Sequence, residues 1–270
     1  PDFEGEEGAV AESDGGGDKV DLKLPGLQLE LLQAISQLGK PIVLVLLNGS
    51  PVELNWPHDN VEAIVEAWYP GEEGGTAVAD VIFGKYNPAG RLPITLVKSI
   101  DQLPPFRDYS MENRTYRYME SARLYPFGYG LSYTSFEYSN LKVSREELST
   151  EDNDDLLVSV EVENTGKLAG DEVVQLYIKD LEASVRVPHW QLNGVQRIHL
   201  QPGEKARVEF TLTKRQFALI DEEGKCLLEP GVFRIYVGGQ QPDERSKELT
   251  GQEVLSTEIK YTGTSVEMEY

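Results

Sequence analysis

Carboxylates are the side chains of this sequence whose type and spacing could do chemistry. The sequence contains no G-x-S-x-G serine elbow, no phosphate-binding glycine loop and no HExxH zinc helix. A dense acidic segment lies at its beginning, where Glu4, Glu6 and Glu7 fall within Phe3–Gly8. A glutamate that is crowded by other carboxylates and partly desolvated by a bound ligand has a raised pKa, which suits a general acid. Glu6, flanked by Glu4 and Glu7, fits this description.

The surroundings of these carboxylates predict a loop. Residues 1–24 are rich in glycine and acidic residues and cannot bury enough apolar surface to form an element of their own. The residues by themselves favour a solvated acidic tail, because runs of charge are usually solvated. The chain begins at Pro1, without a methionine, as though it were cut inside a domain, so we expect the true N-terminus and any targeting signal to lie upstream.

The overall composition excludes several classes of function. The 46 acidic residues exceed the 25 basic ones, giving a formal net charge of −21, so neither nucleic acid nor an anionic membrane is an expected partner. No apolar run reaches the roughly 18 residues that span a bilayer. A single cysteine, Cys226, excludes an internal disulfide, and the three histidines lack metal-ligand spacing. We expect no metal and no cofactor.

The first half of the chain alternates helix and strand patterns. Apolar residues recur at helical spacing over 27–38, and the aliphatic run at 42–47 predicts a central strand buried on both faces. A second strand over 63–68 precedes a Pro-Gly turn and an apolar helix that has Glu72 and Glu73 in its first turn. A further strand is expected by Leu96. This order predicts a three-layer α/β sandwich with a mostly parallel sheet.

Two loops of this α/β region leave the carboxyl ends of predicted strands. They are Asn48–Ser50 and Tyr69–Glu72. Ligands of open parallel sheets bind at this edge, so these loops mark the expected functional edge.

The second half has a different pattern. A connector over 98–134 is rich in aromatic residues and arginine, which could contact sugars or could form an aromatic interface between two domains through Tyr125, Phe127 and Tyr129. From Phe136 the apolar period is two, with strands near 156–163, 173–178, 206–212 and 232–237 and a last one near 254–261. We therefore predict an α/β domain at 1–134 and an all-β sandwich of the immunoglobulin or fibronectin type III kind at 135–270.

Three long stretches carry a family resemblance. They are NGSPVELNW from Asn48, WYPGEEGGTAVADVIFGKYNPAGRLPITL from Trp68, and LYPFGYGLSYTSFEYSNL from Leu124. Together they closely resemble the C-terminal half of glycoside hydrolase family 3, the β-glucosidases and β-xylosidases. The later strands are similar to the fibronectin type III-like domain that ends many members.

The resemblance implies a retaining, exo-acting β-glycosidase that hydrolyses O-glycosyl bonds of β-linked oligosaccharides or glycosides. In the family, a loop before a D-x-x-L-P-type segment carries the acid/base glutamate. Here that segment is Asp21–Pro25, and Glu6 is the best match, with Glu7 and Glu4 as rivals. The nucleophile is an aspartate on a (β/α)8 barrel that this chain does not contain, so we expect the chain alone to be inactive.

Two further points concern the resemblance. Relatives commonly have Gly-Asp-Arg where this chain has Gly17-Asp18-Lys19, and lysine cannot make the planar two-point contact of arginine. The resemblance also favours a periplasmic or secreted protein. The alternative to an enzyme is a non-catalytic carbohydrate-binding or scaffold module.

Overall fold

The computed structural model describes residues 21–269, and the chain forms two compact units. The first, called the α/β unit here, consists of the described residues up to Tyr86 together with Leu96–Tyr109 and Ser121–Leu124. The second, the β-sandwich unit, consists of Asn87–Thr95, Ser110–Glu120 and the chain from Tyr125 onward. The division into domains at 1–134 and 135–270 stays a prediction.

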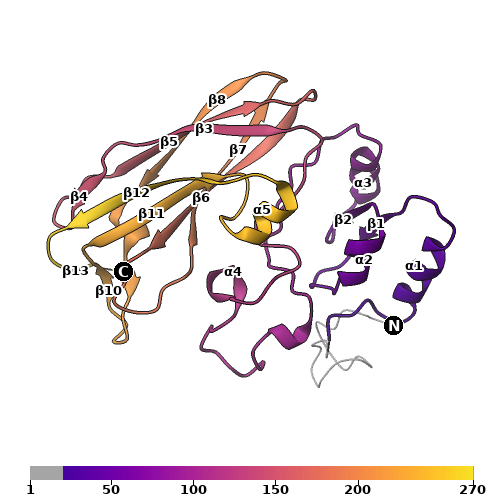
Figure 1. Ribbon diagram of the computed structural model, residues 1–270, viewed down its shortest axis with the longest axis horizontal. Helices are drawn as coiled ribbons and strands as arrows, with labels where there is room; N and C mark the ends of the chain where they lie inside the picture. The colour runs from indigo at the N-terminus through magenta and orange to yellow at the C-terminus, as the bar shows by residue number, and fades with distance from the viewer. Residues whose placement is uncertain (1–20, 270) are drawn as a thin grey trace. The chain divides into compact units, whose positions relative to one another are not determined.

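The α/β unit contains a parallel pair of strands and short helices (Figure 1). Its elements are α1 (Gln28–Ser36), β1 (Val43–Leu46), α2 (Asn55–Asn60), β2 (Ala63–Glu66), α3 (Gly74–Ile82) and the 3₁₀ helix η1 (Ile100–Gln102). The turn before α3 requires glycine, because Gly71 has a φ of +73° and a Cβ on Gly74 would lie 2.4 Å from Cγ of Pro70.

Three details of this unit differ from the sequence-based expectations. The strand β1 is not buried on both faces: Val43 is 46% exposed, since α1 contributes no buried residue to cover it. The helix α3 begins at Gly74, so Glu72 lies before the helix and Glu73 occupies its N-cap. Residues 91–96 form no further strand, apart from a single bridge at Leu96.

The β-sandwich unit consists of two main antiparallel layers and a small third sheet (Figure 1). One layer has the order β3-β5-β8, the other β4-β12-β11-β6-β7, and the small sheet β13-β10-β9; only the β4–β12 pair is parallel. The strands are β3 (Phe136–Val143), β4 (Glu147–Ser149), β5 (Leu156–Asn164), β6 (Gly170–Asp180), β7 (Gln191–Leu200), β8 (Lys205–Leu212), β9 (Leu219–Ile220), β10 (Cys226–Leu228), β11 (Gly231–Gly238), β12 (Leu255–Thr262) and β13 (Val266–Glu267). The helices are α4 (Thr115–Tyr118), η2 (Lys214–Phe217) and α5 (Glu244–Thr250).

The core of the sandwich comes from the inward residues of both layers. Alternate residues of β5 and β11, among them Val158, Val160, Phe233 and Ile235, are buried in one cluster. This is the period of two expected for strands with one face on a core. The strands predicted near 156–163, 173–178, 206–212, 232–237 and 254–261 are confirmed by β5, β6, β8, β11 and β12.

A buried ion pair fixes the Gly-Arg-Leu-Pro segment within the β-sandwich unit. The Arg91 guanidinium lies 2.8 Å from a Glu172 carboxylate oxygen and also donates to the Gly239 carbonyl. The Tyr138 hydroxyl donates to the other Glu172 oxygen at 2.7 Å. Burial raises the pKa of Glu172 and outweighs the lowering effect of Arg91 and of these hydrogen bonds. Arg91 and Glu172 therefore both have hydrogen-bond partners, but burial removes their charges from water at a large cost in free energy.

Candidate functional site

The carboxyl ends of β1 and β2 form the candidate site of the α/β unit. The two strands are parallel, with Leu46 opposite Glu66, and the amide of Ala67 donates to the Leu46 carbonyl at 3.0 Å. The loops Asn48–Ser50 and Tyr69–Glu72 therefore leave the sheet at the same edge, as the sequence predicted.

Asn48 is a buried polar residue at this edge. Its side-chain amide is buried at 6% exposure and donates to the Ser50 carbonyl at 2.8 Å and more weakly to Glu66 at 3.5 Å. Within the described part of the chain, neither Asn48 Oδ1 nor Ser50 Oγ has a hydrogen-bond partner. An unsatisfied buried polar atom costs about 1–3 kcal/mol. The edge thus holds a buried acceptor and a buried hydroxyl whose hydrogen-bonding capacity is unused among the described residues.

Trp68, two residues beyond Glu66, has an unusual backbone conformation. Its φ is +52°, a region that bulky L-residues rarely adopt, and its amide donates to Glu66 Oε1 at 3.3 Å. Such outliers cluster at functional sites, where the surrounding structure holds them. The next residue in the chain, Tyr69, is exposed.

The edge has the chemistry of a binding site. Glu66 is the one carboxylate among the hydrogen-bonding groups described above, whereas glycosidic cleavage needs two carboxylates on either side of the scissile bond. In residues 21–269, no group of three or more His, Cys, Asp or Glu side chains is placed to hold a metal ion. None of the helices described is both long and apolar enough to cross a membrane.

The predicted catalytic residues fall in another part of the chain. Glu4, Glu6 and Glu7, and also Asp18-Lys19, lie outside the described residues. The segment that follows them, Asp21–Pro25, is described: the Leu22 carbonyl accepts from the Glu53 amide at 2.5 Å, and Leu24 is buried. This segment is therefore held against the chain that follows Asn48–Ser50 at the edge.

Several aromatic residues of the connector lie in the β-sandwich unit and stack on one another. Tyr116 stacks on Phe127 with ring centroids 4.3 Å apart, and Tyr125 stacks on Tyr129 at 5.5 Å. The Tyr116 hydroxyl also accepts from the Leu192 amide at 3.2 Å. These contacts give the rings a structural role in this unit. The interface between two domains proposed for Tyr125, Phe127 and Tyr129 remains a prediction.

Sequence reasoning found the edge but not the side chains that distinguish it. The unpaired oxygens of Asn48 and Ser50 and the positive φ of Trp68 arise from loop geometry, which no periodicity reports. The available signal was the Asn-Gly-Ser turn directly after an aliphatic run.

Two parts of the chain match known protein families. Residues 3–133 match the glycosyl hydrolase family 3 C-terminal domain, and residues 172–241 match the fibronectin type III-like domain. The chain contains the C-terminal domain of glycoside hydrolase family 3. It represents the C-terminal part of that family, which confirms the resemblance and the two predicted fold classes.

Relatives in family 3 support the same assignment. The chain is 42% identical to xylan 1,4-beta-xylosidase of Xylanibacter ruminicola, over 93% of this chain and 29% of the relative. It is 40% identical to thermostable beta-glucosidase B of Acetivibrio thermocellus, over 86% and 32%.

Solved structures of the family give the same picture. A beta-glucosidase from Erythrobacter marinus matches with a TM-score of 0.78 at 40% identity, covering 94% of this chain and 32% of that one. Beta-glucosidase from Kluyveromyces marxianus matches with a TM-score of 0.79 at 32% identity, over 93% and 30%. The chain thus spans about a third of the length of its family 3 relatives.

Proposed function

We propose that this chain is the C-terminal part of a retaining, exo-acting β-glycosidase and supplies its acid/base loop. The observation that carries the proposal is the family 3 match over residues 3–133, which includes the acidic segment Phe3–Gly8. The relatives are named as β-xylosidases and β-glucosidases. The substrate class is therefore a β-linked oligosaccharide or glycoside, and the partner is a (β/α)8 barrel that carries the nucleophilic aspartate.

Retaining hydrolysis divides the work between two carboxylates about 5–5.5 Å apart. The barrel aspartate attacks the anomeric carbon and forms a glycosyl-enzyme. Glu6 first donates a proton to the leaving oxygen and then accepts one from the water that hydrolyses this intermediate. Its neighbours Glu4 and Glu7 favour a raised pKa through like-charge repulsion.

The edge of the α/β unit could help to position the acidic loop, although it does not supply the catalytic acid. The segment after the acidic loop, Asp21–Pro25, is tied by Leu22 to Glu53, close in the chain to Asn48 and Ser50.

The test is substitution of the acidic residues in the complete enzyme, barrel included. Glu6→Gln keeps the shape of the side chain but removes the proton donor, so turnover should fall by ~10²–10⁴-fold. Aryl glycosides with acidic phenols should suffer less in the first step, because their leaving groups need little protonation. Azide should restore turnover of such a substrate by attacking the glycosyl-enzyme, yielding a β-glycosyl azide.

The matched controls are Glu4→Gln and Glu7→Gln, which should show neither signature. If azide restores turnover of the Glu7→Gln variant instead, Glu7 rather than Glu6 is the acid/base residue. Rescue at none of the three positions would show that this loop does not supply the catalytic acid. The alternative, a non-catalytic carbohydrate-binding or scaffold module, predicts that no barrel with a catalytic aspartate is joined to this chain in its reading frame.

A further inference from the structure

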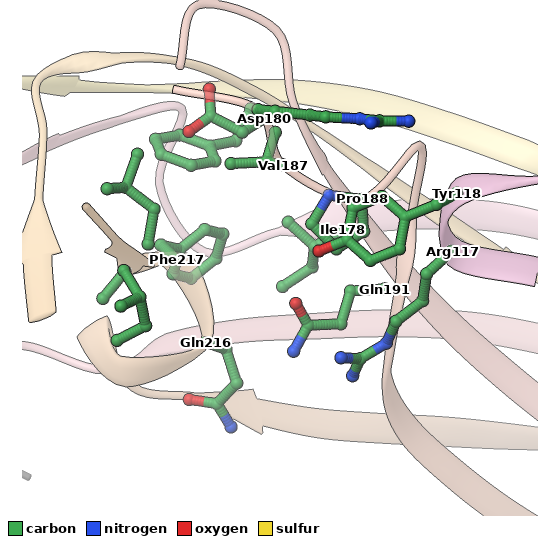
Figure 2. Close-up of a pocket in the computed structure, with 14 residues that line it drawn as sticks. Arg117, Tyr118, Ile178, Asp180, Val187, Pro188, Gln191, Gln216 and Phe217 are labelled. Carbon is green, nitrogen blue, oxygen red and sulfur yellow. The ribbon is translucent and has the colours of Figure 1, made fainter. Parts of the chain in front are cut away.

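The β-sandwich unit contains a pocket of about 270 Å³ (Figure 2). It is formed where α4 meets the end of β6, the loop that follows β6, the start of β7 and the 3₁₀ helix η2. This volume is near the lower end of small-molecule pockets, so the space suits one small ring. Its lining combines charged, amide and apolar side chains.

One end of the pocket carries hydrogen-bond donors without protein partners. Figure 2 shows the ends of the Arg117 and Gln191 side chains in the same part of the pocket. Within residues 21–269, neither the Arg117 guanidinium nor the Gln191 side-chain amide makes a hydrogen bond or an ion pair. The backbone of Arg117 is nevertheless fixed, since its carbonyl accepts from the His189 amide at 2.7 Å.

A second guanidinium, that of Arg186, also lines the pocket. Arg186 is placed with its Cζ 5.6 Å from the ring centre of Tyr118, and its partner Glu112 is exposed and 3.5 Å away. Exposed ion pairs of this kind contribute little, so Arg186 can turn toward an anion in the pocket.

The opposite end of the pocket carries a hydrogen-bond acceptor, the Asp180 carboxylate, and an apolar wall lies between the two ends. Asp180 lies away from Arg117 in Figure 2, and one of its oxygens accepts from the Glu182 amide at 3.0 Å. Ile178, Phe217 and Phe233 are buried and form an apolar wall. The pocket is thus polarised, with cationic donors at one end, a carboxylate at the other and an apolar surface between.

This polarity narrows the choice of ligand. A purely apolar molecule would desolvate the Arg117 guanidinium and the Asp180 carboxylate without adding a hydrogen bond to either. Inorganic phosphate would meet the Asp180 carboxylate in the same small space. A neutral sugar could bind Asp180 and Gln191 through its hydroxyls but would leave the guanidinium without a matching anion. A sugar ring that carries a carboxylate satisfies all three groups and places its C–H face on Phe217.

We infer that this pocket binds a uronic acid residue, with the sugar carboxylate on Arg117 and its hydroxyls on Gln191 and Asp180. The choice of a sugar rests on the proposed function, whereas the requirement for a carboxylate rests on Arg117 and Arg186. The site would hold an acidic branch or unit of the polysaccharide on the β-sandwich unit.

Calorimetric titration of the 270-residue chain tests the inference, with methyl β-D-glucuronide, methyl β-D-glucoside and sodium acetate as probes. The glucuronide should bind about tenfold more tightly than the glucoside, since it adds a charge-assisted hydrogen bond. Acetate should bind more weakly than the glucuronide, because it lacks the ring. Arg117→Gln should abolish the preference for the glucuronide, and Asp180→Asn should weaken both glycosides.

The matched control is Arg207→Gln on β8, whose guanidinium pairs with Glu209 and does not line the pocket. It should leave all three affinities unchanged. The inference fails if the glucuronide does not saturate, if acetate binds equally well, or if Arg117→Gln leaves the preference intact. These outcomes are independent of azide rescue in the complete enzyme, so failure here and failure of the proposed function are distinguishable.

Discussion

The apolar pattern of α1 and that of β6 lead to opposite results. In the β-sandwich unit, Leu176 on β6 is completely buried at 0% exposure, within a cluster that both main layers share. In the α/β unit, Leu31 on α1 is 61% exposed, and the helix has no buried residue. Both segments carry the periodicity that predicts a buried face.

The difference teaches that periodicity identifies a face but not what covers it. The strand β6 pairs with β7 and β11, and residues of the opposite layer lie over its inner side. The apolar stripe of α1 finds no equivalent cover among the residues described. Stability should therefore be unequal between the two units, since local unfolding follows the density of buried contacts.

Amide hydrogen exchange should give the largest contrast. The strand β1 has β2 as its described partner and an exposed Val43, so its amides should exchange at least about a thousandfold faster than those of β6. Residue-resolved exchange at neutral pH measures this ratio. The expectation from the aliphatic run alone was the reverse, and equal protection in both strands would break the comparison.

The buried ion pair should give the next largest effect, in the β-sandwich unit. Arg91→Met leaves Glu172 buried without its cation and should lower the free energy of unfolding by about 3–5 kcal/mol at neutral pH. Arg234→Met is the control, because the pair of Arg234 with Glu258 is exposed and should contribute at most about 1 kcal/mol.

The same variant has a defined pH dependence. The folded pKa of Glu172 is already raised, and removing Arg91 raises it further. Its proton is bound more tightly in the folded state, so folding is favoured below the unfolded pKa of about 4.5 and loses stability as pH rises through the folded value. Denaturant unfolding at low and neutral pH should show a smaller loss for Arg91→Met at low pH. An equal loss of stability at low and at neutral pH would show that the ionised Glu172 carboxylate is not the cause of the destabilisation.

Truncation of one leucine in each unit should have smaller effects on the free energy of unfolding, and these effects compare the burial of β6 with that of α1. Leu176→Ala removes a core side chain and should cost about 2–5 kcal/mol. Leu31→Ala, the same change on an exposed stripe, should stay within about 0.5 kcal/mol. Urea unfolding followed through NMR signals of β6 and of α1 measures the loss of stability in each unit separately. A large loss from Leu31→Ala would show that the stripe of α1 is covered in solution.

The sequence alone predicted much of the fold and only the neighbourhood of the site. The period of two predicted the strands β5, β6, β8, β11 and β12, because alternate residues of each, such as Val158 and Leu176, face the core. The prediction failed where burial depends on distant partners, since β1 lacks a second cover. The strands β3 and β7 were not among the strands predicted. The ends of parallel strands located the edge at Asn48 and Glu66.

Only the tertiary structure decided which side chains act together. Arg91 and Glu172 meet across a long stretch of sequence, and Arg117, Asp180 and Gln191 come from three separate elements to line one pocket. Residue types and local spacing carry no information on such contacts, because they depend on how strands and loops pack after the chain has folded. Glu6 is the opposite case, since its assignment depends on the sequence alone.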